Sequence, residues 1–290
     1  IVVPFATGGP AENYARYVAQ KLQDALGQSF VIDNKPGGGS VIGTDIAAKA
    51  PADGYTLLMM SNTHTANETL IPNKPFALMR DFVAVASINY SDLLLVAHPG
   101  TGINSVADLL AKAKAQPGKI NYASSGPGTP YHMAGELFKY MAKVDMVHVP
   151  YKGSSGARTD VLGGQVDLMF DAVTTMAEHV KAGKVKALAT TGRARSTVLP
   201  EVPTGAEAKV QGISIEPWAA IFAPPAMSAD LSARLSREVN AVLKRPDAKE
   251  QFDRQGFEPS GSTPQELAAF HRAQWDSWTR TVREQGLKFD

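Results

Sequence analysis

Cysteine is absent from the 290 residues of this chain, and its absence excludes several kinds of site at once. Without a thiol there is no disulfide, no cysteine-ligated metal ion and no cysteine nucleophile. A chain of this length buries enough surface to be stable without disulfides. Its composition therefore fits both an oxidising compartment and a reducing one.

Two further absences narrow the class of protein. No run of apolar residues approaches the roughly 20 that are needed to cross a bilayer. Neither sign of charge dominates, because 29 Lys and Arg residues face 28 Asp and Glu residues, for a formal net charge of +1. The composition therefore gives no indication of a nucleic-acid-binding surface or a polybasic membrane patch.

Motifs for cofactors and for catalysis are also missing. Neither G-x-G-x-x-G nor G-x-x-x-x-G-K-[ST] occurs, and Gly153–Gly156 does not fit the nucleophile elbow G-x-S-x-G. No two histidines are spaced as H-x-x-x-H or H-x-H, and no second carboxylate is placed by spacing to work with Asp171. We therefore predict no cofactor, no metal site and no enzymatic activity.

What the sequence does contain is an alternation of strand and helix patterns. Short apolar runs at Ile1–Phe5, Phe30–Ile32 and Tyr55–Met60 predict strands. Between them, apolar residues at helical spacing predict one helix from Pro10 to a stop at Gly27 and a second helix through Ala50. A β-α-β-α-β order of this kind implies a parallel sheet.

The same alternation of predicted strands and helices resumes after Pro99. Ser105 and Asp108 resemble a capping pair for a helix through Ala115, and Thr129 with Pro130 is typical of a helix start. The segment from Ser228 onward is predicted to be mostly helical. Further strands are predicted at Asn121–Ala123, Met146–Val149, Val166–Phe170 and Val185–Ala189.

The chain could pass from one domain to the other at two segments, Val83–Val96 and Ile213–Ala223. The second segment contains Pro217, which is unsuited to a central strand. We therefore predict a discontinuous first domain, 1–97 plus 216–290, and an inserted second domain, 98–215. The predicted fold class is α/β with two lobes, each lobe a mostly parallel sheet flanked by helices.

Three glycine-rich turns join predicted strands to predicted helices, at Phe5–Pro10, Pro36–Ser40 and Ser124–Thr129. A helix N-terminus has unpaired N–H groups and about half a positive charge, and glycine lets a ligand approach them closely. Ligands of open parallel sheets lie beyond the carboxyl ends of the strands, so such turns suit an anion such as a carboxylate. Glycine that serves only the backbone conformation of the turn is the alternative.

The first and third turns open the first helix of each βα run, so we favour them over the middle one. Their candidate ligand-binding residues are Phe5, Thr7, Gly8 and Gly9 in the first turn, and Ser124, Ser125, Gly126, Gly128 and Thr129 in the third.

Five other residues are candidates, each with a structural alternative. His132 lies one turn into the helix after the third turn, where a buried packing role is equally plausible. Ser61 and His64 follow a predicted strand, where they would otherwise belong to a solvated loop. Asp171 ends a strand and would otherwise cap a helix. Trp218 could stack on a planar ligand or pack in a core.

Taken in order along the chain, five stretches resemble the Bug-type receptors, which are the substrate-binding proteins of tripartite tricarboxylate transporters. One departure is Ala11-Glu12, where the family commonly has a small residue followed by Asp. The matching stretches are Val2–Pro10, Asn34–Ser40, Ala50–Leu57, Ser124–Thr129 with His132–Phe138, and Val149–Gly153 through Gly163–Asp167.

The resemblance implies a periplasmic Venus-flytrap protein that closes on a small carboxylate. It also implies that the turns at Phe5–Pro10 and Ser124–Thr129 grip a ligand carboxylate through backbone amides and ordered water, and that Asp171 contacts the distal part of the ligand. Tyr151, within a matching stretch, joins the candidate residues. With Trp218, Tyr131 favours an aromatic or aliphatic dicarboxylate such as terephthalate.

The resemblance also implies partners and a location. The partner is a membrane transporter, although some relatives present their ligand to a sensor kinase instead. We expect a monomer in the periplasm, with no nucleic-acid partner, and a signal peptide that preceded Ile1.

Two other classes of protein remain as alternatives. An α/β hydrolase or transferase would use His132 or His64 with a serine, and it would turn its substrate over. The effector domain of a cytosolic regulator would have a similar fold. Neither alternative accounts for the five ordered stretches.

Overall fold

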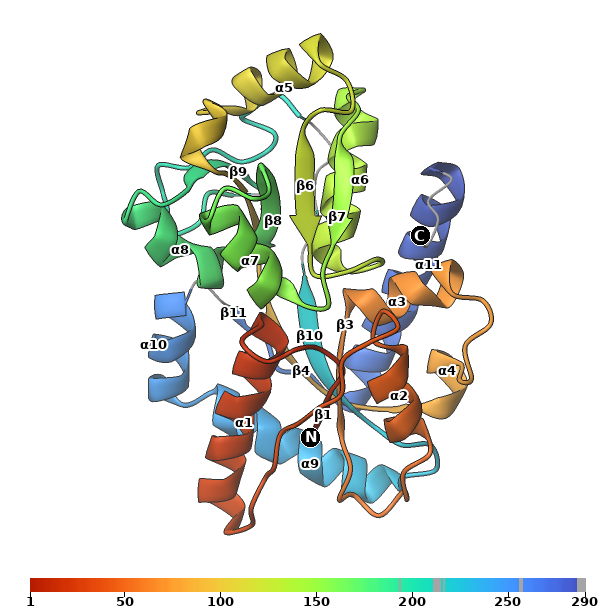
Figure 1. Cartoon of the computed structure of the whole chain (residues 1–290). Coiled ribbons are helices and arrows are strands. Elements are labelled where there is room, and N and C mark those ends of the chain that lie inside the picture. The colour runs from red at the N-terminus through yellow and green to blue at the C-terminus, as the bar shows by residue number, and fades with distance from the viewer. Residues whose placement is uncertain (193, 211–214, 216, 256–257, 286–290) are drawn as a thin grey trace. The chain divides into compact units, whose positions relative to one another are not determined.

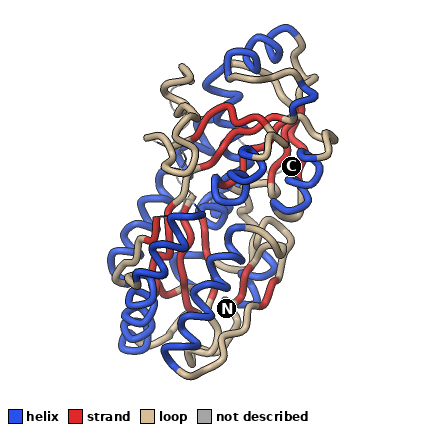
Figure 2. Tube along the Cα trace, turned by 90° about the vertical axis from the view of Figure 1, so that its left-hand side faces the viewer, coloured by secondary structure: helices blue, strands red, loops and turns tan. Residues whose placement is uncertain are grey.

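The computed structural model describes residues 1–290 except 193, 211–214, 216, 256–257 and 286–290. The chain divides into two compact units (Figure 1). Unit 1 comprises Ile1–Tyr90, Trp218–Phe252 and Glu258–Asp290, and unit 2 comprises Ser91–Pro217 with Asp253–Phe257. In each unit the strands form a layer between helices (Figure 2).

The observed division differs from the predicted one at the first crossing. We expected that crossing at 97/98, but Leu93–Ala97 forms strand β5, which pairs with strands of unit 2. The sequence from Val83 to Val96 reads as one apolar run, and Ser91-Asp92 splits it into two strands in different sheets. The second predicted crossing, 215/216, involves residue 216, which lies outside the described residues.

Unit 1 contains a six-stranded sheet in the order β11-β4-β10-β3-β1-β2. The pairs β1–β2 and β1–β3 are parallel, whereas β10 runs antiparallel to β3 and β4, and β11 antiparallel to β4. The strands are β1 (Val2–Val3), β2 (Asp33–Asn34), β3 (Leu58–Ser61), β4 (Val83–Tyr90), β10 (Trp218–Ala223) and β11 (Glu258–Pro259).

Helices cover both faces of this sheet. Side chains of Leu58, Met60 and Phe222 pack on one face against α2, α4 and α11. On the other side, α9 contacts β4, and α1 contacts β1 and β3. The helices are α1 (Pro10–Leu26), α2 (Val41–Ala48), α3 (Asn62–Leu70), α4 (Leu78–Asp81), α9 (Ala229–Leu243) and α11 (Pro264–Gln285), with the first part of α10 (Pro246–Gln255), whose residues from Asp253 belong to unit 2.

Unit 2 contains a five-stranded sheet in the order β7-β6-β8-β5-β9. Strand β6 is parallel to β7 and β8, and only β5 is reversed, pairing antiparallel with β8 and β9. Besides β5, the strands are β6 (Asn121–Ser124), β7 (Val147–Pro150), β8 (Leu168–Ala172) and β9 (Lys186–Thr190).

The helices of unit 2 also lie on two faces. Ala157 of α7 and Met176 of α8 pack with Met169 on one face, while Phe138 of α6 contacts Phe170 on the other, with ring centroids 6.2 Å apart. The helices are η1 (Pro99–Thr101), α5 (Val106–Ala115), α6 (Pro130–Ala142), α7 (Ser154–Leu162) and α8 (Val173–Lys181). No helix within the described residues is long and apolar enough to cross a membrane.

The helix ends that carry clear signals are where the sequence predicts them. Helix α1 begins at Pro10 and ends at Gly27, whose φ of 65° is the left-handed conformation that glycine favours. Thr129 caps α6, and the Ser105 hydroxyl accepts the N–H of Asp108 at the start of α5.

One predicted strand is displaced. The apolar run Phe30–Ile32 predicts a strand, but the strand that forms is Asp33–Asn34, and Val31 is exposed. Parallel pairing with β1 fixes the register, since Val2 lies opposite Asp33 and Val3 opposite Asn34. The pairing geometry therefore outweighs the local hydrophobic pattern.

A substitution at Gly135 in α6 tests how closely that helix packs on its sheet. A Cβ atom at Gly135 would lie 2.2 Å from Cε2 of Tyr122, whose ring is fully buried. We expect Gly135→Ala to lower the free energy of unfolding by about 1–3 kcal/mol, because the ring cannot move aside. In Gly156→Ala, also within a helix, the nearest atom is Tyr151 Cδ1 at 3.3 Å, so this control should not lower the free energy of unfolding by more than about 0.5 kcal/mol. Urea unfolding measures both, and equal effects would contradict the packing argument.

Candidate functional site

Each unit brings three helix N-termini to the carboxyl edge of its own sheet. In unit 1, α1, α2 and α3 follow the parallel strands β1, β2 and β3. In unit 2, α6, α7 and α8 follow the parallel strands β6, β7 and β8. Both edges therefore concentrate backbone N–H donors and the positive ends of helix dipoles.

Several of these helix starts have no side chain that caps them. No side-chain cap is formed at Gly9 before α1 or at Ser40 before α2 in unit 1. None is formed at Gly153 before α7 or at Ala172 before α8 in unit 2. The N–H groups of these first turns therefore remain available to an anionic ligand.

In unit 1, the first glycine turn is held by Glu12. The N–H of Gly8 donates to Glu12 Oε2 at 2.6 Å, and Arg16 Nε donates to Glu12 Oε1 at 3.1 Å. Burial alone would raise the pKa of Glu12, but the bonds from Arg16 and Gly8 outweigh it and hold the pKa below its ordinary value. The side chain of Glu12 thus folds back onto its own turn.

The third glycine turn, in unit 2, is built in the same way. The N–H of Gly128 donates to His132 Nδ1 at 3.1 Å, so a glycine again donates to the side chain four residues on. Gly8 and Gly128 have φ angles of 79° and 73°, which explains why both positions hold glycine. Thr129 Oγ1 also donates to the carbonyl of Gly126 at 2.7 Å.

These contacts assign some of the candidate amides to the turns themselves. The N–H of Gly126 donates to Ser124 Oγ at 3.1 Å, and the N–H groups of Gly8 and Gly128 have the partners just described. The three groups fix the shape of the turns. That these two turns contact a ligand stays a prediction.

Behind the third turn lies a stack of aromatic rings. The rings of His132 and His148 are stacked with centroids 4.3 Å apart, and His148 stacks on Tyr122 at 5.0 Å. Ser124 Oγ lies 2.6 Å from His148 Nε2. Burial lowers the pKa of His148 to about 3, so the ring is neutral.

The contact between Ser124 and His148 has the form of a nucleophile and its base, but its surroundings differ from those of a hydrolase. Ser124 is fully buried, and its hydroxyl also accepts the N–H of Gly126. His132 and His64, the two histidines of the hydrolase alternative, accept backbone N–H groups instead. All three side chains thus support helix starts.

His64 is buried at the start of α3 rather than lying in a loop. Its Nδ1 accepts the N–H of Ser61 at 3.1 Å, so its Nε2 carries the proton and donates to Thr44 Oγ1 at 3.1 Å. Thr44 Oγ1 in turn donates to the carbonyl of Ser40 at 2.8 Å. Burial lowers the pKa of His64 to about 3, and the neutral ring ties the start of α2 to the start of α3.

Asp171 is fully buried at the end of β8. Its Oδ2 accepts from Arg158 Nε of α7 at 2.9 Å, and its Oδ1 accepts the N–H of Ala172 at 2.8 Å. Burial raises the pKa of the Asp171 carboxyl, while Arg158 and the hydrogen bonds act in the opposite direction. Ala172, not Asp171, occupies the N-cap position of α8. The predicted contact of Asp171 with a ligand stays a prediction.

The aromatic candidates lie in different surroundings. Phe5 contacts the ring of His64, with centroids 6.1 Å apart, at the carboxyl edge of unit 1. The hydroxyl of Tyr151 donates to Asp160, and burial together with this hydrogen bond raises the pKa of Tyr151 to about 12. Trp218 is buried in the core of unit 1 against Phe270, and its stacking on a ligand stays a prediction.

Three residues of these edges were not among the predicted ones. Glu12 could have been found from its spacing, because it follows Gly8 as His132 follows Gly128. Arg158 had an indirect signal, since an acid inside an apolar strand needs a cation. His148 carried no signal, because its role depends on the neighbouring strand.

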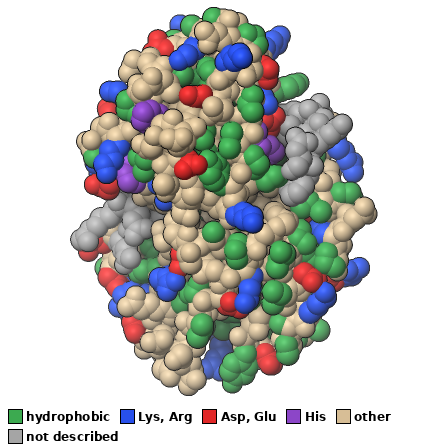
Figure 3. All heavy atoms as spheres, in the orientation of Figure 1, with side chains coloured by type: hydrophobic (Ala, Val, Ile, Leu, Met, Phe, Trp, Pro, Cys, Tyr) green, Lys and Arg blue, Asp and Glu red, His purple; other side chains and the backbone are tan. Residues whose placement is uncertain are grey.

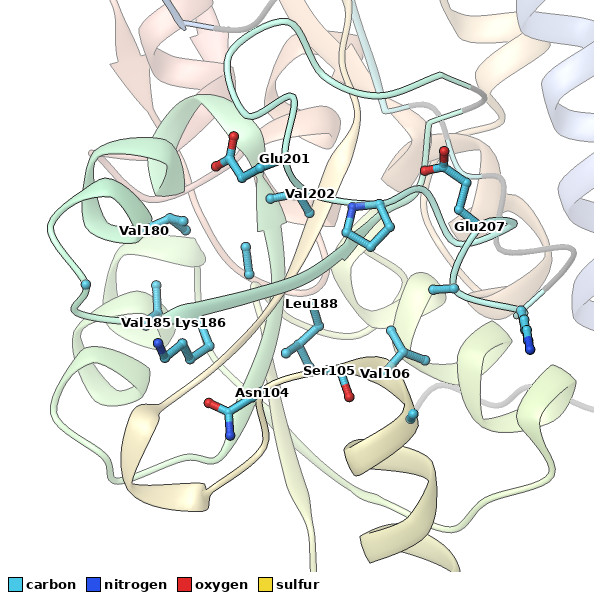
Figure 4. A pocket seen from close by; sticks show the side chains of 16 residues that line it. Asn104, Ser105, Val106, Val180, Val185, Lys186, Leu188, Glu201, Val202 and Glu207 are labelled. Carbon is cyan, nitrogen blue, oxygen red and sulfur yellow. The ribbon is translucent and has the colours of Figure 1, made fainter.

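A separate cavity of about 660 Å³ lies in unit 2 (Figure 4). It is lined by the beginnings of α5 and β9, and none of the predicted site residues lines it. On the face in Figure 3, basic and acidic side chains of the described chain are interspersed. Among the described residues, no group of three His, Asp or Glu side chains is placed to hold a metal ion.

Comparison with known families identifies this arrangement. The family model described as "Tripartite tricarboxylate transporter family receptor" matches residues 14–287. The chain belongs to this receptor family. The predicted Bug-type identity and the two-lobed α/β fold are thereby confirmed, and so is the prediction that the chain is a receptor and not an enzyme.

Individual proteins are similar to this chain over nearly its whole length. The Bordetella pertussis protein BugT is 36% identical over 290 residues, which are 99% of this chain and 89% of BugT. The solved structure "R. palustris Rpa4515 with adipate" has a TM-score of 0.95 at 32% identity and covers 99% of this chain and 97% of that one. MatC from Rhodopseudomonas palustris with bound malate has a TM-score of 0.90 at 28% identity, and 97% of each chain is covered.

The buried histidines of the receptor predict how its stability depends on pH. Burial lowers the pKa values of His64 and His148 to about 3 and of His271 to about 4, below the ordinary 6.5. Because the unfolded chain takes up these protons first, the free energy of unfolding should fall as the pH drops from 6.5 to 4.5.

Each histidine contributes at most about 1.4 kcal/mol per pH unit to this slope. Chemical denaturation at several pH values measures it, and His148→Gln should make it shallower. A free energy of unfolding that is constant between pH 6.5 and 4.5 would contradict neutral burial of these rings.

Thr129 and Ser105 form a matched pair of helix caps in unit 2 of the receptor. Thr129→Ala and Ser105→Ala should each lower the free energy of unfolding by about 1 kcal/mol, because each removes the cap of a helix start. Only Thr129→Ala should also weaken carboxylate binding, measured by calorimetry, since only Thr129 belongs to a glycine turn. Equal binding by both variants would remove Thr129 from the site.

Proposed function

We propose that this protein is a periplasmic receptor that captures a small dicarboxylate and delivers it to a membrane transporter, without changing it chemically. The observation that carries the proposal is the set of uncapped helix starts at the carboxyl edges, those of α1 and α2 in unit 1 and of α7 and α8 in unit 2. Fixed N–H dipoles of this kind bind carboxylates at little cost of reorganisation.

The carboxylate class is supported by relatives of known ligand. The structures of Rpa4515 and MatC hold adipate and malate, both of which are small dicarboxylates. For this chain we propose a ligand of the same class, aliphatic or aromatic, with terephthalate as the aromatic candidate. Trp218, one of the two residues that favoured the aromatic acid, is buried against Phe270, so both kinds of acid are tested.

Membership of the receptor family also supports a mode of capture. We propose that the candidate residues of units 1 and 2 act on one ligand and that the units close on it, so that the ligand stabilises the closed form by its differential contacts. We also propose that the protein acts as a monomer and that its partners are the membrane subunits of a tripartite tricarboxylate transporter.

A thermal-shift panel of mono-, di- and tricarboxylates, with adipate, malate, phthalate and terephthalate among them, tests this function. A ligand at about 100 times its dissociation constant should stabilise the fold by roughly 2.7 kcal/mol, which raises the melting temperature by roughly 5 °C. Neutral diamides of the same acids are the controls and should produce no shift.

The ligand should also be recovered intact after incubation, as judged by chromatography. A panel in which no acid raises the melting temperature would overturn the carboxylate assignment, and consumption of an acid would overturn the receptor function.

A further inference from the structure

Resting on the proposed function, we propose that Arg158 is the residue that recognises the second carboxylate of the ligand, and so makes the receptor selective for dicarboxylates. Asp171 lies near the end of β8, at the carboxyl edge of the sheet of unit 2. The guanidinium of Arg158 lies against its carboxyl group.

The contacts of Arg158 leave part of its guanidinium free. Nε donates to Asp171 Oδ2 at 2.9 Å, and Nη2 lies 3.4 Å from Ser154 Oγ in the first turn of α7. Within the described chain, no acceptor contacts Nη1. With 13% of its side chain exposed, Arg158 is anchored by Asp171 and still presents N–H donors.

The charge of the pair decides which ligand group it suits. With Asp171 ionised, the pair with Arg158 is neutral, and with Asp171 protonated the pair carries one positive charge. In neither state is there a net negative charge to attract an ammonium group. The free donors of Arg158 therefore favour a carboxylate at this position.

The surroundings of Arg158 add further donors for the same group. Arg158 bridges Ser154 at the start of α7 and Asp171, which immediately precedes the N-cap of α8, and both of these helix starts lack a side-chain cap. Thr174 Oγ1, in the first turn of α8, is buried without a partner among the described residues. A polar atom of this kind needs a partner, which a ligand oxygen would supply.

The glycine turn before α6 lies on the same edge of unit 2. The N–H of Tyr151, which leads into α7, donates to the carbonyl of Ser124 at 3.1 Å. A Cβ atom at Gly126 would lie 2.9 Å from the carbonyl oxygen of Tyr151, so the two loops are in contact. Arg158 and the glycine turn before α6 thus lie at one edge of unit 2, on loops that contact each other.

Three ligands that differ only in the charge of the distal group test this proposal: adipate, its half-amide adipamate, and 6-aminohexanoate. Calorimetry should give the affinity order adipate, adipamate, 6-aminohexanoate, with about 10- to 100-fold between the first two. Arg158→Gln should reduce the ratio of adipate to adipamate affinity to near 1, because it removes the charge that distinguishes them. Terephthalate with 4-carbamoylbenzoate repeats the comparison for an aromatic acid.

Two further variants separate recognition from folding. Arg158→Gln/Asp171→Asn avoids leaving a buried unpaired carboxylate and should lose the discrimination as well. Arg195→Gln removes another arginine of unit 2, which pairs with Glu207 on the surface, and should keep the wild-type ratio.

The outcomes distinguish this proposal from the function on which it rests. If both Arg158 variants keep the wild-type ratio of adipate to adipamate affinity, the role of Arg158 is overturned, while carboxylate binding stands. An equal loss of affinity for adipate and adipamate would overturn it in the same way. Tighter binding of 6-aminohexanoate than of adipate would assign the position to Asp171 instead. A wild-type protein that binds none of the acids overturns both proposals.

Discussion

The N–H groups at the start of a helix must find an acceptor, and much of this protein is arranged around that requirement. Parallel strands bring three helix starts to one edge in each unit. At some of them a side chain supplies the acceptor, as Thr129 does for α6. At α7 and α8 no side chain does so. The unpaired N–H groups of these two helix starts can therefore bind an anion.

Neutral histidines serve the capped helix starts. A ring nitrogen accepts a backbone N–H only when it is unprotonated, so His64 and His132 must stay neutral to hold Ser61 and Gly128. Burial keeps His64 neutral by lowering its pKa. A neutral acceptor also leaves the local positive potential for the ligand, whereas Glu12 at the equivalent place in unit 1 brings a negative charge that Arg16 offsets.

Local signals in the sequence were sufficient for those features that depend on a few neighbouring residues. Pro10, Gly27 and Thr129 predicted helix ends that the structure contains, because capping involves residues within one turn. The reversed strand β5 and the displaced strand β2 could not be predicted in this way, since pairing partners distant in the chain determine both. The same holds for Arg158 and Asp171, which lie 13 residues apart on a helix and a strand.

The pair formed by Arg158 and Asp171 connects the stability of unit 2 with its selectivity. A carboxylate that is fully buried in β8 is stabilised by a compensating cation, and in this fold the cation is Arg158, at the edge where the helix starts are uncapped. An arginine has five N–H donors, and Asp171 and Ser154 engage only two of its nitrogens. The remaining N–H donors can therefore bind a ligand carboxylate. Because the buried residue is an acid, Asp171, its partner is a cation, and the recognised group is an anion.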